Sequence, residues 1–146
     1  MKELALGETL TEQLRREAWA ALPRECCGLI EGVLEGSRVR ATRLHPTRNV
    51  ATRAERFEID PGDHIRLLRT ARKEGRKIVG CYHSHPHGRA ELSERDRMDA
   101  ATDEFIWLVA ALRPDAPLEL AAYVSSRGAW ESCALTCTPE LASAKA

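Results

Sequence analysis

The sequence has no net charge, no long apolar run and no Cys-x-x-Cys pair, and each absence excludes a class of function. Its 22 lysines and arginines balance 22 aspartates and glutamates, which does not favour a nucleic-acid or membrane-surface partner. No apolar stretch approaches the roughly 18 residues that a membrane span requires. The first ten residues, MKELALGETL, lack the apolar core and cleavage site of a secretory signal. We therefore expect a cytoplasmic protein; the sequence does not indicate its oligomeric state.

The cysteines do not have the spacing of a disulfide or zinc-ribbon framework. Their number is odd, which is typical of free thiols in a reducing compartment. Because a free cysteine behaves as a small apolar side chain, we expect most of them in the core. The five are Cys26, Cys27, Cys81, Cys133 and Cys137.

The 146 residues suffice for one domain with a substantial core. Periodicity predicts helices over 10–22, 61–75 and 93–102, and strands over 26–34, 37–46, 77–83, 105–112, 118–125 and 129–137. Thr9 and Glu12 resemble a capping box for the first helix. This order predicts an α/β (α+β) fold, with a central mixed β-sheet flanked by helices. We expect a single domain over 1–140 and a disordered tail over 141–146.

Basic residues crowd the second predicted helix and its C-terminal end. They form either a docking patch for an acidic partner or a solvated helix face, and the neutral total favours the solvated face. These residues are Arg66, Arg69, Arg72, Lys73, Arg76 and Lys77.

Three of the five histidines lie in the segment CYHSHPHGRAELSERD, residues 81–96. His83 and His85 are two apart at a predicted strand end, so both imidazoles leave the same face. They are about 6.6 Å apart along the strand, from where two imidazoles can bind one ion. Cys81 shares this face but lies about 13 Å from His85, so we expect a packed neighbour rather than a ligand. His87 follows Pro86, where strand geometry is lost, and is a weaker candidate.

Ser93 and Asp96 are three apart at the start of a predicted helix and so share a face. One interpretation is a capping box, with Ser93 at the N-cap and Asp96 reaching back. The other is that Asp96 is a third metal ligand, and the two interpretations are compatible. Two imidazoles and one carboxylate leave a coordination position open, as catalytic zinc sites do.

The same segment resembles the metal motif of the JAMM/MPN-plus zinc metallopeptidase family: His-Ser/Thr-His, seven residues, Ser, two residues, Asp. The upstream PRECCGL is similar to that family's Pro-x-Glu-x-Cys-Gly-Leu, and RFEIDP and IVGCYHSHP are similar to its compact prokaryotic branch. Two positions depart from the pattern: Leu92, where proline is common, and Cys81, where a bulky aromatic is common. The implied MPN/JAMM-like fold is related in outline to the cytidine-deaminase fold, although the His-x-Glu and Pro-Cys-x-x-Cys signatures of deaminases are absent.

The resemblance implies one Zn²⁺ per chain, held by His83, His85 and Asp96, with a water of lowered pKa as the fourth ligand. It also implies that Glu25 is the general base and that Ser93 donates a hydrogen bond to the oxyanion. No Gly-x-Ser-x-Gly nucleophile elbow is present.

The implied reaction is hydrolysis of a peptide or isopeptide bond after a Gly-Gly tail. The insertions of polyubiquitin-specific members are missing, so a ubiquitin-like sulfur-carrier protein is the favoured substrate over linked ubiquitin. The alternative function is a metal-free MPN scaffold that binds proteins without catalysis. Such scaffolds typically lose the ligands that this sequence retains.

Overall fold

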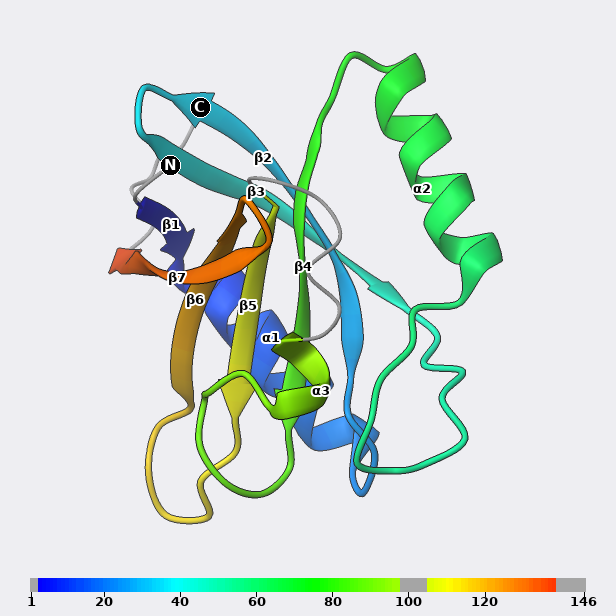
Figure 1. Ribbon diagram of the computed structural model, residues 1–146, viewed down its shortest axis with the longest axis vertical. Coiled ribbons are helices and arrows are strands. Elements are labelled where there is room, and N and C mark those ends of the chain that lie inside the picture. Colours follow the sequence, from blue (N-terminus) through cyan, green and yellow to red (C-terminus); the bar gives the residue numbers. More distant parts are fainter. Residues whose placement is uncertain (1–2, 98–104, 139–146) are drawn as a thin grey trace.

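The computed structural model describes residues 3–97 and 105–138, and within them the strands form a closed ring (Figure 1). The elements along the chain are β1 (Glu3–Gly7), α1 (Glu8–Ala21), β2 (Cys27–Glu35), β3 (Arg38–Thr47), α2 (Pro61–Lys73), β4 (Ile78–His85), α3 (Glu94–Arg97), β5 (Ile106–Ala111), β6 (Glu119–Ser126) and β7 (Ala129–Thr138).

The sheet is mixed, as the sequence predicts, but it also closes on itself, which the sequence does not predict. Its order is β1-β3-β2-β4-β5-β6-β7. The β4–β5 pair is parallel, and β1 runs parallel to both β3 and β7. The remaining neighbours are antiparallel. The element missing from the prediction is β1, which closes the ring.

The central strands β4 and β5 are buried on both faces, as expected for β4. Leu108 on β5 lies in one apolar cluster, to which α1 contributes Leu14 and Ala18. The neighbouring Trp107 and Val109 lie in a second cluster on the opposite face. This alternation follows from the strand period of two. A side chain on β4 therefore faces either the α1 side or the side that carries the histidines.

The start of α1 differs from the prediction. The helix begins at Glu8, and its N-cap is Gly7, which provides no side-chain cap. The Thr11 hydroxyl instead donates to the Gly7 carbonyl oxygen at 3.0 Å. The predicted capping box of Thr9 and Glu12 is therefore wrong. The physical reason is that β1 runs directly into the helix and places Thr9 inside its first turn.

The start of α2 agrees with the prediction. Pro61 occupies the first turn, where a missing amide costs little. The Asp60 carboxylate accepts from the Asp63 amide at 3.0 Å, which satisfies one of the free amides of the helix end.

The basic residues at α2 divide into two groups. Arg76 is largely buried and forms ion pairs with Glu31 at 2.9 Å and Glu74 at 2.6 Å, so it belongs to the folded framework. Arg69 and Arg72 are exposed on the helix. Exposure at these positions fits a solvated helix face and a docking patch equally well, so both interpretations stay open.

All five cysteines are free thiols, and four of them are buried. Burial raises the pKa of Cys26 to about 12 and that of Cys27 to about 11. The expectation of core thiols is confirmed for these positions, and Cys137 is the exposed exception. Within 3–97 and 105–138, no helix has the length and apolar character needed to cross a membrane.

Candidate active site and metal centre

The strand β4 ends at His85 and directs His83 and His85 to the same face, with ring centroids 5.0 Å apart. His83 is completely buried. Its ring stacks on Phe57 at 4.2 Å with 13° between the planes, and Trp107 packs edge-on at 5.6 Å. The surrounding aromatic rings therefore fix the orientation of this imidazole before any ion binds.

Hydrogen bonding determines which nitrogen of His85 is available. Its Nδ1–H donates to the Arg89 carbonyl oxygen at 2.9 Å, since a carbonyl can only accept. The lone pair is therefore on Nε2, as in a metal-ligating histidine whose other nitrogen is held by a carbonyl. In His83, Nε2 also points to the site, while the buried Nδ1 has no hydrogen-bond partner among the described residues.

Asp96 reaches both imidazoles from α3. Its Oδ2 lies 3.1 Å from His83 Nε2 and 3.5 Å from His85 Nε2. The same oxygen accepts from the Ser93 amide at 2.9 Å, and the Asp96 amide donates to Ser93 Oγ at 3.0 Å. The reciprocal capping pair thus forms and also orients the carboxylate toward the histidines. Residues 98–102 of the predicted helix lie outside the described residues.

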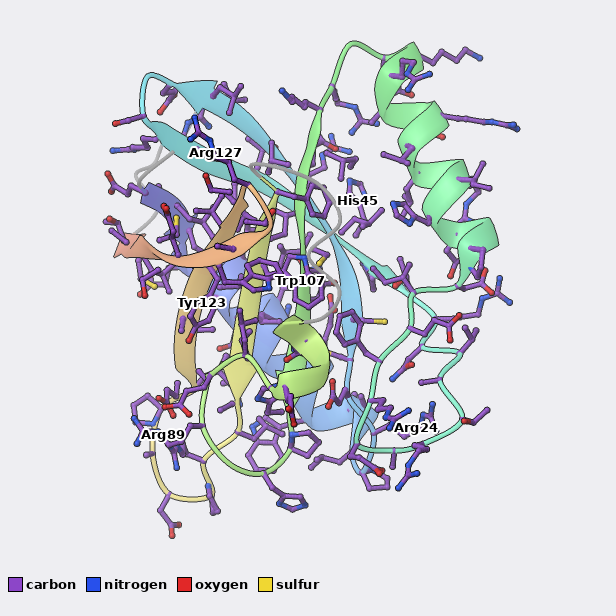
Figure 2. The ribbon with its side chains drawn as sticks, in the orientation of Figure 1. Arg24, His45, Arg89, Trp107, Tyr123 and Arg127 are labelled. Carbon is purple, nitrogen blue, oxygen red and sulfur yellow. The ribbon has the colours of Figure 1, made fainter. Side chains whose placement is uncertain are left out.

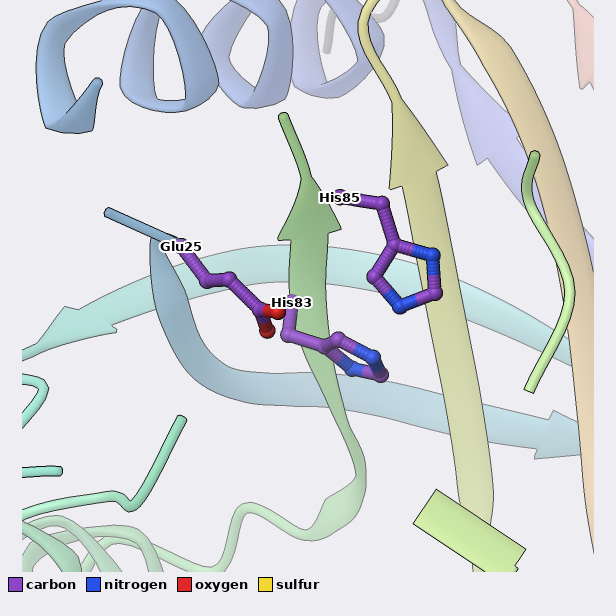
Figure 3. Close-up of side chains that lie close together, drawn as sticks. All are labelled: Glu25, His83 and His85. Carbon is purple, nitrogen blue, oxygen red and sulfur yellow. The ribbon is translucent and has the colours of Figure 1, made fainter. Parts of the chain in front are cut away.

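Glu25 approaches from the segment that leads into β2. Cys27 pairs with His83 in the sheet, so the residue two positions earlier lies across from His85. Glu25, His83 and His85 each offer one donor atom, and these atoms lie within 4.8 Å of one another (Figure 3). Glu25 is only 6% exposed. The two imidazoles therefore have the Glu25 carboxyl close by and also contact the Asp96 carboxylate.

The surroundings shift the pKa values of the Glu25 and Asp96 carboxyl groups in opposite directions. Burial raises the pKa of Glu25 to about 8, an effect that His85 partly opposes. Burial also acts to raise the pKa of Asp96, but hydrogen bonds from His83 and His85 outweigh it and the pKa is lowered. Burial lowers the pKa of His83. For His85, burial acts the same way, but Asp96 and the Arg89 carbonyl reverse it and the pKa is raised.

A cleft of about 430 Å³ opens onto these groups. It includes three of the predicted site residues, Glu25, His85 and Ser93. His87 lies on its wall as an exposed side chain and does not belong to the donor cluster. The lining residues are Pro23, Glu25, Ala54, Glu55, His85, Pro86, His87 and Ser93.

The segment between β4 and α3 is held against the sheet by Tyr123 and Trp107, which lie side by side in Figure 2. The Tyr123 hydroxyl donates to the Ala90 carbonyl at 2.8 Å. Cys81 and Leu92, the two departures from the family pattern, are buried in the same cluster. Cys81 is a packed neighbour of the site, as expected.

Sequence reasoning missed the side chains that support the site. Phe57 lies in the stretch RFEIDP, and its stacking on His83 was not predicted; the signal available was that it is one of only two phenylalanines. No sequence pattern around Asn49 indicated a role in the site, yet its side-chain amide donates a hydrogen bond to the Glu25 carbonyl oxygen.

The profile of the family described as prokaryotic homologs of the JAB domain matches residues 7–127. A desampylase from Haloferax volcanii is 30% identical over 103 residues, spanning 70% of this chain and 73% of the relative. A probable TtuB-protein conjugate cleaving protease from Thermus thermophilus is 34% identical over 92 residues, 62% of this chain and 59% of the relative. A tail tip assembly protein K from Escherichia phage N15 is 28% identical over 66% of this chain but only 36% of its own length.

Two solution structures share the fold. A protein from Desulfitobacterium hafniense has a TM-score of 0.84 at 26% identity, with 95% of both chains covered. A protein from Salinibacter ruber has a TM-score of 0.67 at 25% identity, covering 94% of this chain and 91% of that one.

Proposed function

Because this chain belongs to the family of prokaryotic homologs of the JAB domain, we propose that it is a zinc peptidase that cleaves after the Gly-Gly tail of a ubiquitin-like or sulfur-carrier protein. The observation that carries the proposal is the convergence of His83, His85 and Asp96 beside Glu25 at the cleft. The names of two relatives, a desampylase and a conjugate cleaving protease, support a hydrolase that acts on such conjugates.

The donor set suits a bound zinc ion. His83 and His85 present Nε2 atoms, and Asp96 presents one oxygen to both, which is a set of nitrogen and oxygen ligands that zinc accepts. In His83, Nδ1 has no hydrogen-bond partner among the described residues and Nε2 faces Asp96, which supports Nε2 as the nitrogen that would bind the ion. When bound, zinc would supply a Lewis acid that polarises the scissile carbonyl and lowers the pKa of water.

Glu25 is assigned to proton transfer rather than to ligation. Its carboxyl is buried and lies across from His85, at the wall of the cleft where a substrate carbonyl would enter. In this role it accepts the proton of the attacking water and returns a proton to the leaving amine.

Ser93 is assigned to the oxyanion. Its Oγ accepts from the Asp96 amide at 3.0 Å, so its O–H remains available to donate into the cleft, which Ser93 lines. A donor placed where negative charge develops typically contributes about 3–4 kcal/mol to transition-state stabilisation.

The cleft favours a slender, extended tail as its occupant. Glycine has no Cβ, so a Gly-Gly tail can bring its carbonyl close to the histidines where a larger residue would clash. The strands close into a ring, so the tail is expected to enter the cleft and not to add a strand at a long free edge. Recognition would then come from the body of the substrate and its tail. A cytoplasmic location remains part of this proposal.

The deciding experiment is a panel of fusions read by intact mass. It compares sulfur-carrier tails, linked ubiquitin chains and unrelated Gly-Gly peptides, with a tail changed to Ala-Ala as the matched control. We expect cleavage directly after Gly-Gly, preferentially in the sulfur-carrier fusion. Preference for linked ubiquitin would contradict the substrate class, and equal cleavage of all Gly-Gly peptides would show that the body of the carrier is not recognised.

The zinc content of the purified protein separates the peptidase from the metal-free scaffold. If the protein is a zinc peptidase, its zinc content after purification without added metal should approach one per chain, because these ligands bind tightly. A content below about 0.2 per chain that does not rise on reloading would instead support the scaffold.

A further inference from the structure

We propose that Ser84 and Asn49 are positioning residues that hold the Glu25–Cys26 peptide from both sides and so fix the Glu25 carboxyl against the histidines. The inference rests on the proposed role of Glu25. Neither Ser84 nor Asn49 offers a donor atom to the cluster or lines this cleft, so neither is expected to contact the substrate.

The first contact comes from β4. Ser84 lies between the two histidines in the sequence and is completely buried. Because side chains alternate along a strand, the Ser84 side chain leaves the face opposite to that of His83 and His85. There its Oγ accepts from the Cys26 amide at 2.8 Å. The Ser84 amide also donates to the Cys26 carbonyl at 3.1 Å, continuing the ladder beyond the Cys27–His83 pair.

The second contact comes from the loop that follows β3. Asn49 Nδ2 donates to the Glu25 carbonyl at 2.9 Å. The same amide group donates to the Arg56 carbonyl at 3.0 Å, while Oδ1 accepts from the amides of Ala51 and Glu58, each at 3.0 Å. Asn49 therefore uses its side-chain donors and acceptor to connect this loop to the residue before Cys26.

These two contacts act on one peptide unit. The Glu25 carbonyl and the Cys26 amide belong to the same planar group, which also contains the Glu25 Cα. With the carbonyl held by Asn49 and the N–H held by Ser84, both polar groups of that plane are fixed, which restricts the backbone movement of Glu25. Reacting groups must be placed closely, since a shift of about 1 Å can cost a factor of about 100 in rate.

Substitutions at Ser84 test one side of this clamp. Ser84→Ala should lower kcat about 10–100-fold while KM stays within about twofold and the zinc content is unchanged. Ser84→Thr, which keeps the hydroxyl, should recover most of the lost rate. The matched control is Thr42→Val, which removes a hydroxyl that donates to the Glu31 carbonyl at 3.2 Å on the distant half of β2; we expect its kcat to stay within about twofold of the wild type.

Asn49→Asp tests the other side and decides the question if Ser84→Ala does not fold. Aspartate keeps the acceptor for Ala51 and Glu58 but cannot donate to Glu25. The same loss of kcat with retained zinc is expected.

A readout that does not depend on turnover separates this inference from the proposed function. In Ser84→Ala, amide hydrogen exchange at Cys26 should accelerate at least about tenfold, with other β2 amides unchanged. The ¹³C shift of the Glu25 carboxyl should move in Ser84→Ala and Asn49→Asp but not in Thr42→Val. A wild type that cleaves no fusion would refute the proposed function, and these spectra would still report on the clamp. Protection of Cys26 that persists in Ser84→Ala, an unmoved Glu25 signal or an unchanged kcat would overturn the inference.

Discussion

Glu25 and Asp96 face the same pair of imidazoles from different structural settings. Asp96 is anchored by the Ser93 amide and by both histidine rings. Burial governs Glu25 and raises its pKa to about 8. Side chains of one chemical type thus acquire different pKa values from their surroundings, in agreement with the different roles proposed for them above.

Glu25→Gln should retain zinc and lose activity. Glutamine keeps the size and buried position of the side chain but cannot accept a proton, so kcat should fall about 10²–10⁴-fold. The measurement is turnover of the sulfur-carrier fusion together with zinc content. Glu55→Gln, at an exposed carboxyl on the same cleft, is the control and should stay within about threefold of wild type. Wild-type turnover in Glu25→Gln would remove Glu25 from the mechanism.

Asp96→Ala should lose both zinc and activity, because Asp96 supplies the oxygen shared by the two Nε2 atoms. We expect the zinc content, measured by elemental analysis, to fall below about 0.2 per chain. His87→Ala is the control and should keep its metal. If Asp96→Ala keeps a full zinc content and His87→Ala loses its zinc, His87 and not Asp96 is the third ligand.

At the level of the elements, β2 and β4 approach closely at Gly28. A Cβ built there would lie 2.4 Å from the His45 carbonyl oxygen and 2.4 Å from the Tyr82 ring. Tyr82 cannot move aside easily, because it is fully buried and its hydroxyl donates to Glu17 at 2.6 Å. The glycine therefore leaves room for the Tyr82 ring to pack against β2, next to His83 in the sequence.

Gly28→Ala should lower the free energy of unfolding by about 2–3 kcal/mol, the upper part of the range for an overpacked core. Urea unfolding with two spectroscopic probes measures the effect. Gly62→Ala in the first turn of α2 is the control, since its Cβ would meet only the Asp60 carboxylate, at 3.2 Å. A Gly28→Ala protein as stable as the control would show that the strands separate readily.

The anchor of α2 provides a pH-dependent prediction. Hydrogen bonds from the Arg48 guanidinium and amide, and then from Arg66, hold the pKa of Asp63 below its ordinary value. A lowered folded-state pKa contributes stability above the unfolded pKa of about 3.9, and this stability is lost as the pH falls below that value.

Asp63→Asn should therefore lower the urea midpoint at pH 7, and the difference from wild type should shrink at pH 3. The control is Asp115→Asn, at an exposed loop position, which should match wild type at both values. If the difference in urea midpoint between wild type and Asp63→Asn is as large at pH 3 as at pH 7, Asp63 stabilises the helix through packing and not through its charge.

The elements that the sequence predicts well are those with a long periodic pattern. The strands β2 to β7 are apolar runs or alternating patterns bounded by turn residues, and the helix α2 is a periodic segment that begins at Pro61. Asp96 and the histidine pair were predictable because strand and helix periods place them on one face. Asn49 and Ser84 were not, because their contacts join backbone groups 24 and 58 positions away, a distance that no local pattern encodes.

At the scale of the whole molecule, the two apolar clusters lie on either side of the sheet and consist of side chains other than the proposed ligands. The fold therefore does not depend on a metal in the way that a small zinc finger does. Ligand binding to the folded state still adds stability by mass action.

Removal of the metal with a chelator should abolish turnover and leave the far-UV circular dichroism unchanged. The thermal midpoint should fall by about 5–15 °C, and added zinc should restore both quantities. A mock-treated sample, carried through the same buffer exchange, is the control. Loss of the dichroism signal on chelation would show that the barrel requires the ion.

Closure of the barrel was beyond sequence prediction because β1 is a five-residue strand whose partners are distant. Leu4 and Leu6 are fully buried, but an alternation this short is not distinctive. The strand gains its partners only when the rest of the sheet has curved to meet it.

The two pairings of β1, with β3 and with β7, also affect the order in which the barrel can form. Glu3 pairs with Arg38 on one side and with Ala134 on the other, 131 positions later (134 − 3). During synthesis β1 leaves the ribosome before the other strands that the structure describes, and its pairing with β7 can form only after β7 has emerged. Pairing over such a separation carries a large loop-closure entropy, so it belongs to the late and slow part of folding. Until β7 has paired, one edge of β1 lacks its partner strand, and an unpaired strand edge is a site at which chains can aggregate.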